Sequence, residues 1–270
     1  MTIDAFWLAL LVKIAATASV VVVASIVAER AGPFWGALIA CLPVVAGPAY
    51  VLLALDADAA FLRTSALSGI AANAATGLFV LMLHWLAPRR SLVLALAGAI
   101  VIWLLAILAL KATSPWSAMG GLLLNAIVYG AGVRFAAAGG VAVKPVRPAA
   151  WLELPLRALA VGLLVAGTVT ASRAIGPSAT GLAVAFPISL TSLAIVLHRR
   201  LGGAAVGQVM ANGLKAMPGL ALGLLLVAET VVPFGKVAGL IAGLVASCGW
   251  SAGLLTARHL ARQRTIPGFR

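Results

Sequence analysis

Long apolar runs, separated by short breaks, follow one another from end to end of this chain. Nine runs are about 20 residues long, the length that a helix needs to cross the hydrocarbon core of a bilayer. They are residues 5–28, 34–55, 64–86, 91–110, 116–133, 154–171, 178–197, 204–228 and 235–256. The breaks are too short for a soluble domain. The pattern predicts an all-α polytopic membrane protein with about nine transmembrane helices.

Composition agrees with a protein that lies almost wholly in a membrane. Hydrophobic residues make up 63% and charged residues 9% of the 270 residues, whereas soluble domains have about 45–50% and about 25%. This excludes an ordinary soluble domain, a disordered chain and a disulfide scaffold. The net charge of +13 is scattered between the apolar runs, so we interpret it as a topology signal and expect no nucleic-acid partner.

The basic residues alternate from one side of the predicted membrane to the other. With the N-terminus outside and nine crossings, twelve of the 19 lysines and arginines fall on the cytoplasmic side and four outside. Because positively charged loops stay in the cytoplasm, this predicts an N-out, C-in orientation in the cell membrane, and we expect a bacterial inner membrane. The four outer residues are Arg63, Lys111, Arg173 and Lys236.

The first four runs align with the last four without a gap at an offset of 144 residues. The repeat is carried by residue types that seldom coincide by chance: Trp7 with Trp151, Lys13 with Arg157, Gly32-Pro33 with Gly176-Pro177, Pro43 with Pro187, and Gly69 with Gly213. Five predicted spans separate the two starts, so the copies have opposite orientations. The fold prediction is two inverted four-helix repeats, residues 5–110 and 149–256, joined by a fifth span.

The repeat divides the chain into three parts, and its layout resembles that of a known group of transporters. Residues 1–110 hold the first repeat, residues 111–153 the linking span and a cytoplasmic loop, and residues 154–270 the second repeat with a basic tail. The layout alone resembles the small inverted-repeat secondary transporters of the bile-acid-symporter kind. No motif extends that resemblance to single residues.

Two predicted spans carry a proline at their centre, and both are candidates for a substrate site. Pro43 and Pro187 each remove a backbone hydrogen bond, and transporters often expose such interrupted helices to a central cavity. Gly47-Pro48 adds a second interruption after Pro43. Hydroxyl groups follow Pro187 and offer partners for freed carbonyls or for a ligand: Ser189, Thr191 and Ser192.

The next spans of each repeat contribute polar and cationic candidates. Ser68 and Asn73 lie in the span 64–86, and Gln208, Asn212 and Lys215 follow a helical spacing in the span 204–228. An isolated cation near the bilayer centre is unfavourable and usually faces a cavity, so we expect Lys215 to bind an anion there. Lys13 and Arg157 are repeat-related and are candidates for gating or for attracting anions, although long basic side chains near a span end also extend to the interface.

These observations favour a secondary transporter for a small organic anion that works by alternating access. Two alternatives stay open: a lipid flippase or other lipid-handling protein whose cations meet lipid phosphates, and a non-catalytic membrane subunit or scaffold. We expect no enzymatic activity, cofactor or metal site, because the chain lacks paired buried carboxylates and known catalytic motifs. The expected partners are membrane lipid and a small anionic solute. The small-residue stretch 235–253 also allows a homodimer.

Overall fold

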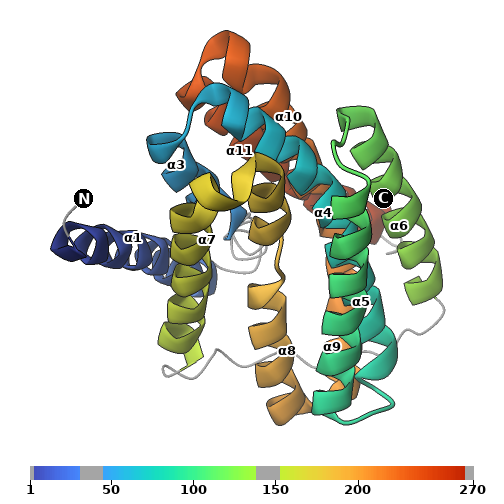
Figure 1. Ribbon diagram of the computed structural model, residues 1–270. Helices are drawn as coiled ribbons and strands as arrows, with labels where there is room; N and C mark the ends of the chain where they lie inside the picture. Colours follow the sequence, from blue (N-terminus) through green and yellow to red (C-terminus); the bar gives the residue numbers. More distant parts are fainter. Residues whose placement is uncertain (1–2, 31–44, 138–152, 265–270) are drawn as a thin grey trace.

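The computed structural model describes residues 3–30, 45–137 and 153–264, and within these ranges 91% of the residues are helical and none forms a strand. Figure 1 shows the helices in chain order. They are α1 (Ile3–Arg30), α3 (Ala46–Asp56), α4 (Ala59–Leu86), α5 (Leu92–Ala112), α6 (Ala118–Ala137), α7 (Glu153–Val184), α8 (Ile188–Leu201), α9 (Gly203–Ala216), α10 (Pro218–Phe234) and α11 (Lys236–Arg264).

Six helical segments in the described part are long and apolar enough to cross a membrane, judged by length and composition. The protein is therefore an all-α, multi-pass membrane protein, but the predicted count of nine spans is not confirmed. Most of the predicted span 154–171 and all of the span 178–197 fall within one helical run, Ala158–Leu201. The described apolar parts of the first two spans are shorter, Leu10–Val23 and Ala46–Asp56. The predicted fifth span forms a complete helix, α6.

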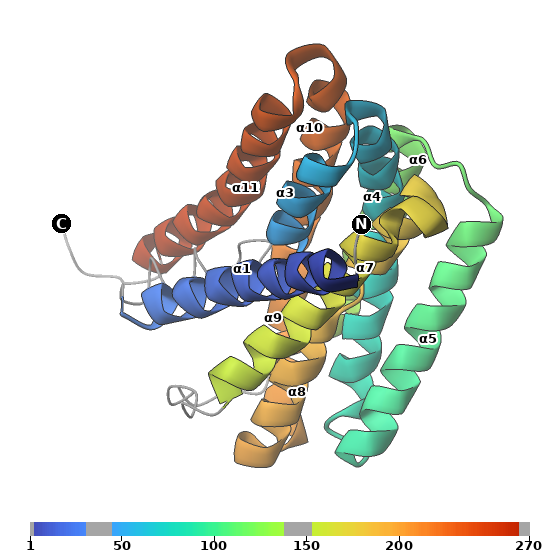
Figure 2. The ribbon, with the colours of Figure 1, turned by 60° about the vertical axis from the view of Figure 1, so that its left-hand side comes forward.

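Helix α4 is the central element of the bundle. In its most apolar window, 78% of the residues are buried, against 17% for the neighbouring α5. It packs against five other helices: α5, α6, α7, α9 and α10. Figure 2 shows the outer position of α5 and shows α1 lying across α7. The leucines and valines that α5 exposes suit contact with lipid chains.

Helix α4 and the pair α9–α10 run antiparallel along one another. Asn73 Nδ2 donates to the Met217 carbonyl at 3.2 Å, and His84 Nδ1 lies 2.7 Å from the Gly207 carbonyl oxygen. As the residue number rises along α4, its partner's number falls. In Figure 1, α4 descends towards the turn that precedes α5, whereas α9 and α10 ascend.

Close backbone approaches bring other helices onto α4. A Cβ atom added at Gly181 of α7 would lie 2.0 Å from the Ser65 carbonyl oxygen. A Cβ atom added at Gly203, the first residue of α9, would lie 1.7 Å from the Ala87 carbonyl oxygen. Only glycine fits such contacts, as in other tightly packed membrane helices.

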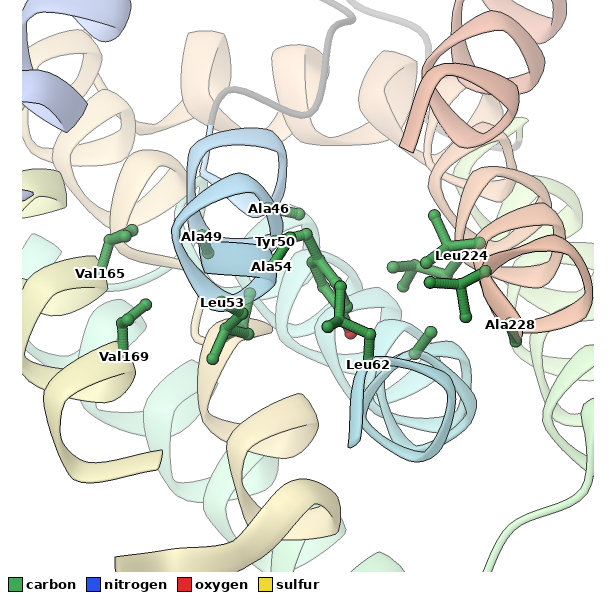
Figure 3. Packing of buried hydrophobic residues seen from close by; sticks show 14 of the residues in the cluster. Ala46, Ala49, Tyr50, Leu53, Ala54, Leu62, Val165, Val169, Leu224 and Ala228 are labelled. Carbon is green, nitrogen blue, oxygen red and sulfur yellow. The ribbon is translucent and has the colours of Figure 1, made fainter. Parts of the chain in front are cut away.

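One apolar cluster joins α3 to α4, α7 and α10 (Figure 3). Leu53 of α3 and Leu62 of α4 are fully buried in it, together with Val165 of α7. Tyr50 projects from α3 into the space that Leu62 and Leu224 border. This cluster holds the short α3 against the long helices and thereby positions Tyr50.

Candidate functional site

The helical run formed by α7 and α8 is interrupted twice. Gly176 has a φ of 80°, which kinks α7 just before Pro177. The helix then ends at Val184, and α8 begins at Ile188 with Pro187 in the capping position and no side-chain cap. The helix is therefore interrupted at Pro187, as the sequence predicts. Pro43, its counterpart in the first repeat, lies outside the described residues.

Side-chain hydroxyl groups donate hydrogen bonds to several backbone carbonyls around the interruption at Pro187. Thr76 Oγ1 of α4 donates to the Ala185 carbonyl at 2.9 Å, and Thr191 Oγ1 donates to the Pro187 carbonyl at 2.9 Å. Ser192 Oγ donates to the Ser189 carbonyl at 2.9 Å. The Thr191 and Ser192 hydroxyl groups are thus hydrogen-bonded to backbone carbonyls at the start of α8. Neither residue lines the cavity described next.

A cavity of about 480 Å³ lies beside the interruption. Its lining comes from α3, α4, the end of α7, and α8 to α11. Four of the predicted site residues line it: Asn73, Pro187, Ser189 and Asn212. A volume of this size is typical of sites for small molecules.

Other predicted site residues lie outside this lining. Ser68 is buried in α4, Gly47 is half-buried in α3, and Gln208 is half-buried in α9. Arg157 belongs to α7, but its side chain lies outside the described part of the structure.

Lys215 does not line the cavity. This corrects the expectation that a lysine ammonium group lies at the centre of the site. The residue is exposed, and its backbone carbonyl accepts a hydrogen bond of 3.0 Å from Trp250 Nε1. The lining residues of α9 are Val209, Met210, Asn212, Gly213 and Ala216. At about 100° per residue, Lys215 points about 110° away from the middle of the stripe formed by 209, 212, 213 and 216. Gln208, Asn212 and Lys215 all lie on α9 at the helical spacing noted in the sequence, and of the three only Asn212 lines the cavity.

Two buried hydroxyl groups line the cavity without a hydrogen-bond partner. Tyr50 is 3% exposed, and neither its hydroxyl group nor Ser189 Oγ has a partner. The Ser65 hydroxyl lies close to Tyr50 but outside hydrogen-bonding geometry, and it too is unpartnered. Buried polar groups normally have partners. These hydroxyl groups therefore suit a polar group of a bound molecule.

Tyr50 was missed by the sequence analysis, although a signal existed. It is one of only two tyrosines in the chain, and it lies seven residues after Pro43 in the run singled out for its prolines. Its side-chain oxygen would lie 2.9 Å from a Cβ atom at Gly69, so the glycine makes room for it. The sequence repeat singled out Gly69, but the contact between Gly69 and the Tyr50 side chain on another helix was not predictable from the sequence.

A buried amide network anchors one wall of the cavity. Asn73 Nδ2 donates to Asn125 Oδ1 at 2.9 Å as well as to the Met217 carbonyl. Asn125 Nδ2 donates to the carbonyls of Ile70 and Gly121, each at 2.7 Å. The network ties α6 and the α9–α10 junction to α4. It gives Asn125, the polar residue in the predicted fifth span, a structural role.

The electrostatic character of the cavity comes from dipoles rather than from charged side chains. None of the described residues that line it is charged, and the sequence of residues 31–44 contains no charge. The N-terminal ends of α3 and α8 both border the cavity, through Val45 and Ala46 and through Pro187 and Ser189. Neither end has a side-chain cap. Helix N-termini carry partial positive charge and favour anions.

Lys13 lies away from this cavity in a cluster around the turn between α3 and α4. Its ammonium group pairs with the Asp56 carboxylate, and both side chains are only partly exposed. This acidic partner offsets the charge that was expected to attract anions.

The comparisons with known proteins add no assignment. No protein-family model, curated protein or solved structure matches this chain.

Proposed function

We propose that this protein is a secondary transporter that moves a small amphipathic organic anion by alternating access between two inverted repeats. The observation that carries the proposal is a cavity bordered by two uncapped helix N-termini, those of α3 and α8, and by two unpartnered hydroxyl groups. Discontinuous helices that direct their N-termini at anionic substrate groups are typical of transporters.

The bounds of the helices support a structural repeat. Helix α4 begins at Ala59 and α9 at Gly203, and α5 begins at Leu92 and α11 at Lys236. Both pairs of starting points differ by 144, the offset found in the sequence. Helix α3 begins at Ala46 and α8 at Ile188, so these two starts agree with the offset to within two residues. The antiparallel course of α4 and α9–α10 supports opposite orientation of the two copies.

The cavity lies where a two-fold relation between the repeats would place its axis. Asn73 and Met217 are equivalent positions, and they are hydrogen-bonded to each other. Two equivalent residues can touch in this way only close to such an axis. Equivalent positions also line the cavity in pairs: 45 with 189, 46 with 190, 69 with 213, 73 with 217, 76 with 220 and 80 with 224.

The lining favours a cargo with an apolar body and one anionic group. Most of the lining is aliphatic, with contributions from Leu190, Leu193 and Leu220, whereas its polar part includes the N-termini of α3 and α8 and the hydroxyl groups of Tyr50 and Ser189. A small carboxylate, sulfonate or phosphate ester with a hydrocarbon part matches this division. In this proposal Tyr50 and Ser189 hold the anionic group, and Asn73 and Asn212 border the cargo.

The first experiment compares anions with neutral analogues. Purified protein is screened by thermal unfolding in detergent with small aliphatic carboxylates, sulfonates and phosphate esters, each beside its amide or alcohol. Acids that raise the unfolding temperature are then tested for uptake into proteoliposomes. We expect Tyr50→Phe and Ser189→Ala to weaken binding about tenfold or more each, as expected for loss of a hydrogen bond to a charged group.

Ser192→Ala provides the matched control, because this serine lies on the same helix but outside the cavity lining. It should bind the acid as the parent does. Equal stabilisation by acids and by their neutral analogues would overturn the anion site, and so would equal effects of the Ser189 and Ser192 substitutions.

The apolar lining also supports the second candidate, a lipid flippase. A phospholipid has a phosphate for the helix N-termini and acyl chains for the leucines. Fluorescent phospholipids reconstituted with the protein distinguish the two functions. Movement of the lipid between leaflets, without uptake of any small acid, would favour the flippase. A scaffold needs neither a cavity nor an interrupted helix, so uptake or lipid movement would exclude the third alternative.

A further inference from the structure

A second cavity borders the same two helices, α4 and α7, that contribute to the central cavity described above. Its volume is about 450 Å³, and it lies at the turn between α3 and α4, where Thr64 of α4 and Pro177 of α7 line it. Later residues of the same helices line the central cavity, beginning with Gly69 of α4 and Gly181 of α7. The two cavities therefore follow one another along the seam between α4 and α7.

One tight contact lies between the two cavities. A Cβ atom added at Gly181 would lie 2.0 Å from the Ser65 carbonyl oxygen, so the backbones of α7 and α4 touch at this point. Both residues are buried, and Ser65 lines neither cavity. Packed backbone therefore closes the seam between them.

The part of α7 that makes this contact is a short helical segment between two backbone breaks. Gly176 has a φ of 80° directly before it, and α7 ends at Val184. Residues 177–184 thus form about two helical turns. A Cβ atom added at Gly176 would meet no atom within 4 Å, so packing around this residue does not oppose a change of its backbone angles. A few residues at such breaks can absorb the backbone change of a hinge.

The two sides of the kink are held differently. Before it, α7 packs along α1, and Arg173 Nη2 donates to the Asp56 carbonyl at 3.0 Å. After it, the described residues form a hydrogen bond to α4 only beyond the segment, where Thr76 Oγ1 donates to the Ala185 carbonyl. Packing alone holds residues 177–184 against α4, so this segment can move while the earlier part of α7 stays in place.

Hydroxyl groups at the contact would gain partners if the segment moved away. Ser65 Oγ and Tyr50 Oη are buried without a hydrogen-bond partner. A Cβ atom added at Gly69 would lie 2.9 Å from Tyr50 Oη and 3.8 Å from the Gly181 carbonyl oxygen, which places both oxygens beside the contact. Unpartnered buried hydroxyl groups disfavour the closed arrangement. Water or an anionic group that enters an opened seam would satisfy them.

We infer that residues 177–184 are a gate between the second cavity and the central cavity, and this inference rests on the proposed transport function. The present conformation is closed, with Gly181 against Ser65. The gate opens by rotation about Gly176, which moves Gly181 away from α4 and joins the two cavities. The cargo then reaches Tyr50 from the end of the bundle that holds the α3–α4 turn.

Thiol accessibility tests the gate without requiring a known substrate. The background carries Cys41→Ala and Cys248→Ala. Thr64→Cys provides a thiol in the second cavity, and Leu193→Cys provides one in the central cavity. A membrane-impermeant maleimide is added to sealed vesicles on the side at which Thr64→Cys reacts. From that side, we expect the thiol at position 193 to react more slowly than the thiol at position 64.

Two substitutions should change the labelling rate of Leu193→Cys in opposite directions. Gly181→Ala should speed labelling about fivefold or more, because the new methyl group pushes the segment off α4. Ser65→Ala should slow labelling about fivefold or more, because the closed gate loses an unpartnered hydroxyl group. Gly167→Ala and Ser68→Ala are the matched controls and should keep the parental rate. A Cβ atom at Gly167 meets no atom within 4 Å, and Ser68 lines neither cavity.

The controls also define what would overturn the gate. Equal rates in Ser65→Ala and Ser68→Ala would do so, and so would a parental rate in a folded Gly181→Ala protein. Ala99→Cys places a thiol at a fully buried position of α5 and detects general loosening. Its labelling in Gly181→Ala at the rate of Leu193→Cys would likewise overturn the gate. Ser65→Ala should unfold at the parental temperature or above, so it decides the question if Gly181→Ala does not fold.

The outcome also separates this inference from the proposed function. If labelling follows the predicted order but no acid is taken up, the gate stands and the proposed cargo is wrong. If an acid is taken up at the parental rate by both Ser65→Ala and Gly181→Ala vesicles, transport stands and the gate is wrong.

Discussion

Asn73 is the residue at which the cavity and the buried amide network meet. It is 2% exposed, and its amide group donates to both Asn125 and Met217. Its backbone carbonyl accepts a hydrogen bond of 2.7 Å from the Tyr129 hydroxyl group. One side chain thus connects three elements that share no local sequence.

Replacement of this side chain should destabilise the protein. Asn73→Ala leaves Asn125 Oδ1 and the Met217 carbonyl without their donor, and we expect a loss of about 1–2 kcal/mol in the free energy of unfolding. Thermal unfolding in detergent measures the change. Asn212→Ala removes an exposed amide and should change stability by less than about 0.5 kcal/mol. Similar unfolding temperatures for the two variants would contradict the structural role of the network.

At the scale of elements, the interrupted helix depends on close contact between α7 and α4. After the kink at Gly176, the last part of α7 reaches α4, where Gly181 meets the Ser65 backbone. The chain then turns at 185–187 and places the N-terminus of α8 beside the cavity. A larger residue at position 181 would displace this segment and thereby the start of α8.

Two glycines of α7 provide a matched test of this contact. Gly181→Ala should lower the free energy of unfolding by about 1–3 kcal/mol, because the new methyl group collides with a backbone carbonyl. A Cβ atom at Gly167 meets no atom within 4 Å. Gly167→Ala should therefore be neutral or slightly stabilising, given the better helix propensity of alanine. Equal unfolding temperatures would show that α7 and α4 do not approach so closely.

At the scale of the whole molecule, a buried α4 is surrounded by helices that expose leucine, valine and other apolar side chains. This arrangement suits a bilayer, where the outer surface contacts lipid and polar groups turn inward. Four of the buried polar residues accordingly lie on α4, namely Ser65, Ser68, Asn73 and Thr76.

The distribution of basic residues predicts the orientation of the molecule. With the N-terminus outside and the C-terminus in the cytoplasm, a thiol at position 58 should react with an impermeant reagent added to intact cells. A thiol at position 90 should react only after the membrane is opened. Asp58→Cys and Arg90→Cys in the background without Cys41 and Cys248 provide the pair, since both positions are exposed. The reverse pattern of labelling would invert the topology.

Features that depend on neighbouring residues were predictable from sequence, and features that depend on how helices are rotated were not. Apolar run length determines that the protein is helical and membrane-embedded, and proline chemistry determines the interruption at Pro187. Contacts between helices that are distant in sequence determined the remaining features. Asp56 pairs with Lys13, and Asn125 is hydrogen-bonded to Asn73. Tyr50 lines the cavity. The rotation of α9 places Asn212 in the cavity lining and leaves Lys215 outside it. Residue spacing determines which side chains share a helix face, but only tertiary packing determines what that face meets.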